Sequence, residues 1–146
     1  MPLSNATCNS FARSFALFRD LLETLDESTL GRKLPGLASN TVGAQFWCVI
    51  GARESYARAI AEGKWKGFSC SLQSLERMRD VRIALDRSEQ QVHEILTNLE
   101  AYSAKQCRLL IDLLEHEAAH QGQLIRYLYG LGLTAPSSWK QRYALT

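Results

Sequence analysis

The chain has 146 residues, of which 46% are hydrophobic and 22% charged, a composition typical of one folded domain and not of a disordered chain. The net charge is only +2 and acidic and basic residues are interleaved, so we expect no nucleic-acid-binding face. The longest uncharged run, residues 34–52, contains proline, glycine and several polar residues, so we expect no membrane-spanning segment.

The four cysteines lie far apart in the sequence, at positions 8, 48, 70 and 107, and form no C-x-x-C pair. The N-terminal residues lack the basic and apolar layout of a signal peptide. We therefore expect free thiols in a protein of the reducing cytoplasm rather than a disulfide framework.

The first half of the chain predicts two helices. Apolar residues at positions 11, 15, 18, 22 and 25 have helical spacing and predict a helix over residues 3–28. The segment "GRKLPG" (31–36) then breaks the pattern with two glycines and a proline. A second helix is expected to begin at Ser39 or Asn40, either of which can cap it, and to end at Gly63.

The second half predicts two further long helices and no strand. After a connection, residues 74–83 are expected to form a short helix, and a third long helix is expected from Asp86, whose capping-box partner is Glu89, to about residue 101. Ser103 and Gln106 form the same signal at the start of a fourth helix, which ends at Gly130. We predict an all-α protein: one four-helix-bundle domain, residues 1–146, with long crossover connections.

The most distinctive motif is His116-Glu117-Ala118-Ala119-His120, which matches H-E-x-x-H. The two histidines lie about 40° apart on a helix, on the same side as Leu113 and Leu124, and are expected to face the core. They are interpreted either as a buried pair bonded to carbonyl groups or water, or as metal ligands, which bundles often build from inward side chains.

The same motif occurs in zinc proteases, but this chain does not fit that class. Such enzymes take a third ligand downstream, and no His, Asp, Glu or Cys follows His120. Glu117-x-x-His120 is also half of a di-iron site, but no second Glu-x-x-His occurs. We therefore predict neither activity.

A third ligand must come from upstream, and Cys48 is the better candidate than His93, which lies at the margin of its helix stripe. Small residues surround Cys48 on one face of the second helix, which indicates either close helix packing or a cavity. They are Thr41, Ala44, Gly51, Ala52, Ser55 and Ala59. A buried thiol beside a metal is deprotonated and binds strongly.

The last helix also carries a second apolar strip on its outer side. This strip consists of Ile111, Leu114, Ala118, Ile125 and Tyr129. An apolar arc of this width exceeds what one core needs, so either neighbouring elements flank this helix on both sides or a second subunit packs there, and we expect a homodimer.

Three segments give the sequence a resemblance to the DinB family of DinB/YfiT-like metalloenzymes. They are "NTVGAQFWCVIGARESYARAI" (40–60), "LLEHEAAHQGQLIRYLYGLGL" (113–133) and "APSSWKQRYAL" (135–145). The resemblance implies a four-helix bundle, often dimeric, in which three histidines hold a divalent metal, usually zinc or nickel. Two of them match His116 and His120, and the third falls on Cys48, a donor set that favours zinc and leaves nickel possible.

The resemblance also implies an activity, because characterised relatives transfer low-molecular-weight thiols. The expected partners are then a small-molecule thiol and an electrophile, with no nucleic acid and no membrane. Glu117 is interpreted as a base or a support for the ligands, or alternatively as a surface carboxylate. The rival interpretation of the whole chain is a non-catalytic bundle, metal-free or structurally metallated, that binds a small ligand or a protein partner.

Overall fold

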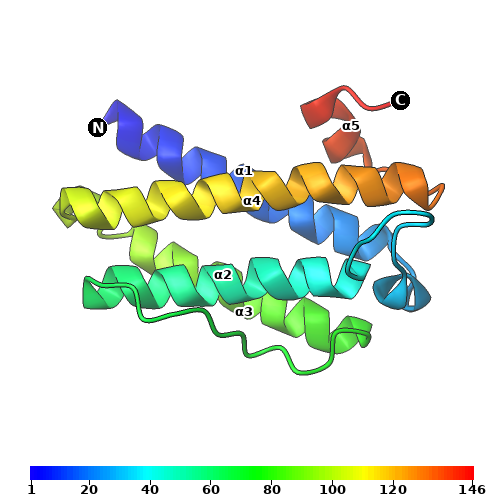
Figure 1. Ribbon diagram of the computed structural model, residues 1–146. Helices are drawn as coiled ribbons and strands as arrows, with labels where there is room; N and C mark the ends of the chain where they lie inside the picture. The colour runs from blue at the N-terminus through cyan, green and yellow to red at the C-terminus, as the bar shows by residue number, and fades with distance from the viewer.

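The computed structural model describes residues 1–146 and contains five α-helices and no β-strand, so the all-α prediction is confirmed. The four long helices are α1 (Pro2–Thr24), α2 (Val42–Glu62), α3 (Met78–Leu96) and α4 (Ala104–Gly130) (Figure 1). The short helix α5 (Ser137–Tyr143) follows them, and two 3-10 turns, η1 (Glu27–Gly31) and η2 (Leu99–Ala101), lie in the connections.

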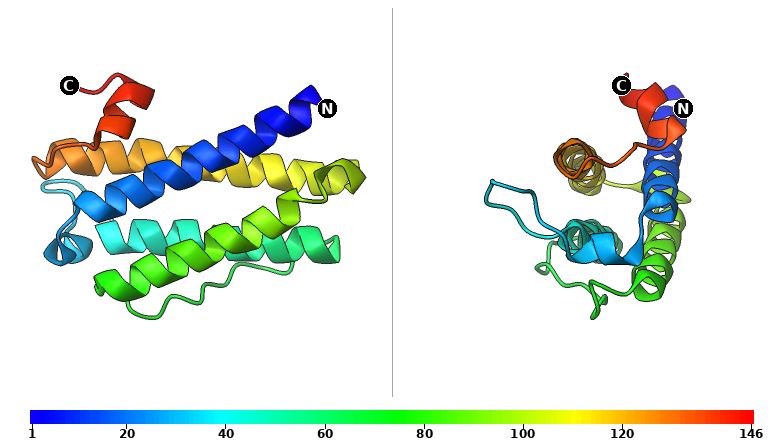
Figure 2. Two further views of the ribbon diagram at one scale, coloured as in Figure 1. Left: turned by 180° about the vertical axis from the view of Figure 1, so that it is seen from behind. Right: turned by 90° about the vertical axis from the view of Figure 1, so that its right-hand side faces the viewer.

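The long helices pack side by side, with α2 against both α3 and α4, and α1 against the same two helices (Figures 1 and 2). α1 and α4 run in one direction and α2 and α3 in the other. α2 and α3 are parallel because the segment 63–77 returns along α2 before α3 begins (Figure 1). Hydrogen bonds hold this segment in place: Ser55 Oγ donates to Ser69 O, and Cys70 Sγ donates to Trp47 O.

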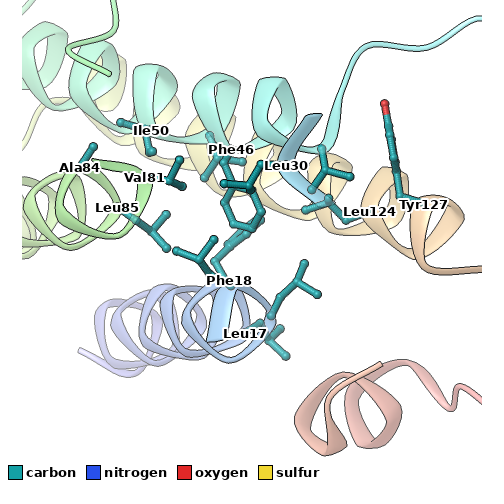
Figure 3. Close-up of a cluster of buried hydrophobic side chains, with 14 of the residues drawn as sticks. Leu17, Phe18, Leu30, Phe46, Ile50, Val81, Ala84, Leu85, Leu124 and Tyr127 are labelled. Carbon is teal, nitrogen blue, oxygen red and sulfur yellow. The ribbon is translucent and has the colours of Figure 1, made fainter. Parts of the chain in front are cut away.

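The core is built from the apolar stripes that the spacing predicted. Phe11, Phe15, Phe18 and Leu22 on α1 are all at most 2% exposed. Phe18 lies in one cluster with Phe46 of α2, Leu85 of α3 and Leu124 of α4 (Figure 3). Burying one such side chain contributes about 1.5–3 kcal/mol, so this cluster fixes the relative positions of the long helices.

Two predicted helix ends are confirmed by their capping geometry. Gly63 terminates α2 in the left-handed conformation, with φ of 78°. At the start of α4, Gln106 N donates to Ser103 Oγ (3.2 Å) while Ser103 N donates to Gln106 Oε1 (2.9 Å), which is the predicted capping box. Both caps depend on neighbouring residues, which explains why the sequence predicts them well.

The predicted start of α2 is wrong. The N-cap is Thr41, whose hydroxyl accepts a hydrogen bond from Ala44 N at 3.1 Å, and not Ser39 or Asn40. Both polar side chains are used elsewhere: Ser39 accepts from Leu34 N, and Asn40 accepts from Gln45 and Tyr127. Because both side chains have other hydrogen-bond partners, neither caps α2.

The predicted start of the third long helix at Asp86 is also wrong. α3 begins at Met78 and passes through Asp86 without a break, so residues 74–83 form no separate short helix. The backbone N–H of Met78, the first residue of α3, donates to Glu27 Oε2 at 3.0 Å. A carboxylate from η1 therefore supplies the cap, and a local capping-box pattern could not indicate it.

The short helix α5 was not predicted, and it closes one end of the core. Trp139 is fully buried, lies edge-on to Phe18 and donates its indole N–H to Leu17 O at 2.6 Å. No helix in the structure combines the length and the hydrophobicity that crossing a bilayer requires.

Candidate functional site

The two histidines of the H-E-x-x-H motif lie side by side on α4. The ring centroids of His116 and His120 are 4.5 Å apart, with the ring planes inclined by 52°. His120 is 7% exposed, and His116 is half-buried. Their neighbours on the same face, Leu113 and Leu124, belong to the core, so the prediction that this face of the helix points inward is confirmed.

The hydrogen bonds of the two rings differ. His120 Nδ1 lies 2.7 Å from Gln45 Oε1 of α2. His116 Nδ1 is buried and has no hydrogen-bond partner at all. Leaving such an atom unpaired costs about 1–3 kcal/mol, and the large majority of buried polar atoms avoid it. The unpaired nitrogen distinguishes this place from an ordinary buried histidine pair.

Both imidazoles are electrically neutral at physiological pH. Burial lowers the pKa of His116 below its ordinary value, and the nearby Glu117 opposes this shift only in part. Burial, reinforced by His116, lowers the pKa of His120 to about 4. A neutral imidazole keeps one nitrogen lone pair, which is the form that binds a metal ion.

Cys48 is half-buried on α2, one turn after Gln45. α2 and α4 are antiparallel neighbours (Figure 1), and the contact of Gln45 with His120 places Cys48 on the helix that faces the two histidines. Even so, the structure brings no three His, Cys, Asp or Glu side chains together in an arrangement that could hold a metal ion. Burial also raises the pKa of the Cys48 thiol.

The small residues beside Cys48 serve close packing. A Cβ atom at Gly43 would lie 2.2 Å from Leu75 O, and one at Gly51 would lie 2.3 Å from the Phe68 ring. The segment 63–77 therefore lies directly on this face of α2. At Gly51 the strip therefore packs closely, but against this segment and not against another helix.

Glu117 lies in the protein interior and is not a surface carboxylate. It is 0% exposed and is paired with Arg53 of α2, which is 1% exposed. Arg53 Nε donates to both carboxylate oxygens at 3.1 and 3.2 Å, Nη2 donates to Oε1 at 2.8 Å, and Ser14 Oγ donates to Oε1 at 3.1 Å. Glu117 thus joins α1, α2 and α4, and its oxygens are already used.

A chain of hydrogen bonds extends from this ion pair to the C-terminal helix. Gln121 Nε2 donates to Ser14 Oγ at 2.7 Å, and Tyr143 of α5 donates its hydroxyl proton to Gln121 Oε1. The Arg53 guanidinium also lies over the Phe15 ring, 4.6 Å from its centroid. The buried polar groups therefore connect four helices.

These buried polar residues can be recognised in the sequence, because they occupy positions of α2 and α4 that point toward the core. Gln45 and Arg53 lie two turns apart, in register with buried Val49, so they occupy core positions of α2. Glu117 and Gln121 do the same on α4. A cation on one inward face and an anion on another are the residues that should be paired first.

The predicted apolar strip of α4 lies at the surface. Ile111 is 47% exposed, Tyr129 is 51% exposed and Ala118 is also exposed, whereas Leu114 and Ile125 pack partly against the core. His93, the third histidine, is exposed and lies 3.8 Å from the Glu89 carboxylate.

No protein-family model matches this chain, and no characterised protein matches it in sequence. The resemblance to the DinB family therefore remains a prediction.

Proposed function

We propose that this chain is a divalent-metal-binding protein with His116 and His120 as ligands, built on a four-helix bundle with long crossover connections. The observation that supports this most is the buried, unpartnered Nδ1 of His116, whose ring lies 4.5 Å from the His120 ring. A cation beside two neutral imidazoles would remove the cost of that unpaired nitrogen. Imidazole is a good ligand for both zinc and nickel, and a thiolate from Cys48 would favour zinc.

Cys48 is the residue that would complete the donor set. It lies on α2, which packs against α4, and two imidazoles with one thiolate are an established zinc combination. Its thiol would have to turn toward the histidines and lose its proton, which a bound cation favours. In the metal-free protein the raised pKa of Cys48 keeps this thiol protonated.

The activity we propose is the transfer of a low-molecular-weight thiol to a small electrophile. A divalent cation with an open coordination position supplies the chemistry of turning a thiol into a thiolate at neutral pH. The chain supplies two uncharged imidazoles on a buried helix face. We assign Glu117 a structural role, because it is fully buried and paired with Arg53 and Ser14.

A second candidate is a helical bundle that binds a ligand or partner without catalysis. One observation favours it: no third His, Cys, Asp or Glu joins the histidine pair. We also propose a homodimer through the exposed strip of α4, where Ile111, Ala118 and Tyr129 lie on one side of the helix.

The first experiment is elemental analysis of the native protein beside a His116→Ala/His120→Ala double variant. We expect about one zinc or nickel ion per native chain and almost none in the variant. Cys48→Ala should lose metal more readily to a chelator, whereas Cys48→His should retain it. A metal content that the double variant leaves unchanged contradicts the proposed site.

The second experiment separates catalysis from simple binding. The melting temperature of the zinc-loaded and metal-free proteins is measured with a panel of small thiols. Stabilisation by a thiol only in the zinc-loaded protein supports the transferase, and consumption of that thiol with an epoxide then tests turnover. Zinc binding with no response to any thiol favours the non-catalytic bundle.

A further inference from the structure

His120 is the end of a chain of hydrogen-bonded neutral side chains that begins at Tyr127 on the same helix. Tyr127, two turns further along α4, is 4% exposed, and its hydroxyl projects away from the apolar cluster (Figure 3). This hydroxyl donates to Asn40, whose backbone and side-chain oxygens lie 2.6 and 2.7 Å away. Asn40 therefore has its carboxamide held in place just before α2.

The next link fixes the orientation of Gln45. Its Nε2 donates to Asn40 Oδ1 at 2.9 Å, so its Oε1 is directed to the other side, toward His120. Gln45 is 3% exposed, and no water-filled space is needed to satisfy either end of its amide. With Gln45 in this orientation, the 2.7 Å separation between Gln45 Oε1 and His120 Nδ1 places a proton on Nδ1, because an amide oxygen can only accept.

We infer that Gln45 is a positioning residue, which holds His120 as the neutral Nδ1–H tautomer and so leaves the lone pair on Nε2 as the atom that binds metal. This inference rests on the metal-binding part of the proposed function for its purpose, but the tautomer is a property of the metal-free chain. Partners of this kind raise the basicity of a ligating imidazole and fix its ring, and losing one typically costs 10–100-fold in metal affinity.

The pairing also explains why the two histidines differ. Gln45 reaches His120, and no side chain does the same for His116, whose Nδ1 stays unpartnered. One imidazole is thus fixed before any ion arrives, and the other is free to adjust. His120 then sets the geometry of the metal site, and this difference between the two histidines follows from Gln45 on α2.

The test is nitrogen NMR of histidine side chains in the chelator-treated, metal-free protein. Spectra of His93→Gln and His116→Gln variants identify the His120 signals. We expect a protonated Nδ1 and an unprotonated Nε2 on His120. Gln45→Leu, which keeps the volume but removes the acceptor, should shift the His120 population toward the Nε2–H tautomer, and Tyr127→Phe should shift it in the same direction by less. The matched control is Gln123→Leu, an exposed glutamine of α4, which should change nothing.

Zinc titration by calorimetry then measures the effect on affinity. We expect Gln45→Leu to weaken zinc binding by about 10–100-fold and Gln123→Leu to leave it unchanged. An Nε2–H tautomer in the native metal-free protein overturns the inference, because Asn40 and Gln45 would then both be oriented the other way. If the native protein has the Nδ1–H tautomer, Gln45→Leu loses it and neither protein binds zinc, the proposed metal site is refuted, whereas the role of Gln45 in setting the tautomer of His120 is supported.

Discussion

The carboxylate of Glu117 accepts hydrogen bonds from two nitrogens of Arg53, and both side chains are buried. Removing one member leaves a buried charge without its partner, which typically costs 3–5 kcal/mol. We therefore expect Glu117→Leu or Arg53→Met to lower the free energy of unfolding in urea by about that amount. The double variant should recover most of the loss, because two apolar side chains of similar volume replace the pair.

The matched control for these single and double variants is Glu115→Leu. Glu115 is exposed and lies 3.7 Å from Arg108, so its removal should cost less than about 1 kcal/mol. Additive losses in the Arg53 and Glu117 double variant would mean that the two charges do not stabilise each other.

Two helical glycines should respond oppositely to alanine. A Cβ at Gly51 would lie 2.3 Å from the Phe68 ring and 2.9 Å from Cys70 Cβ, so Gly51→Ala should destabilise the protein by about 1–3 kcal/mol. Gly122, in the interior of α4, has no atom within 4 Å of the same position, so Gly122→Ala should stabilise it by about 0.5–1 kcal/mol. Thermal unfolding of both variants measures the contrast, and equal effects would show that the segment 63–77 does not pack on α2 as described.

The buried histidines predict an acid-sensitive fold in the metal-free protein. Below pH 6.5 the unfolded chain binds a proton at His120 while the folded chain does not, until the pH nears the folded pKa of about 4. The free energy of unfolding should therefore fall as the pH drops through this window, by up to about 1.4 kcal/mol per pH unit for each such histidine. Urea unfolding at a series of pH values measures this slope, and His120→Gln should reduce it. An unchanged slope in that variant would place the sensitivity elsewhere.

The proposed dimer can be tested at two exposed apolar positions of the α4 strip, Ile111 and Ala118. Ile111→Glu/Ala118→Glu introduces two charges into the exposed strip of α4, so light scattering should report the monomer mass. Gln123→Glu is an exposed control about 120° around the same helix and should leave the mass unchanged. A double variant with the native mass would show that the strip is not the interface.

The sequence predicts the parts of this fold that depend on nearby residues. The stripe from Phe11 to Leu22 and the capping box at Ser103 follow from spacing within one helix, and both are as expected. The start of α3 does not, because its cap is Glu27, 51 residues before Met78. Distance along the chain, and not the strength of the local signal, separates these outcomes.

The candidate site divides in the same way. The facing of His116 and His120 follows from their spacing of one helical turn, and the structure places the rings together. Whether Cys48 reaches them depends on side-chain orientation across two helices, which no periodicity encodes. The partners of Glu117 and His120, Arg53 and Gln45, come from a second helix, and only the register between α2 and α4 reveals them.

The enclosed indole of Trp139 has a consequence for how the protein is made. The space beside Phe18 and Leu17 is filled from α5, more than a hundred residues after the helix that it covers. During synthesis the earlier helices can associate, but the interior beside Phe18 stays open to water until α5 has emerged from the ribosome. Nascent chains stalled before residue 139 should therefore be held by chaperones and cut by proteases that the finished protein resists.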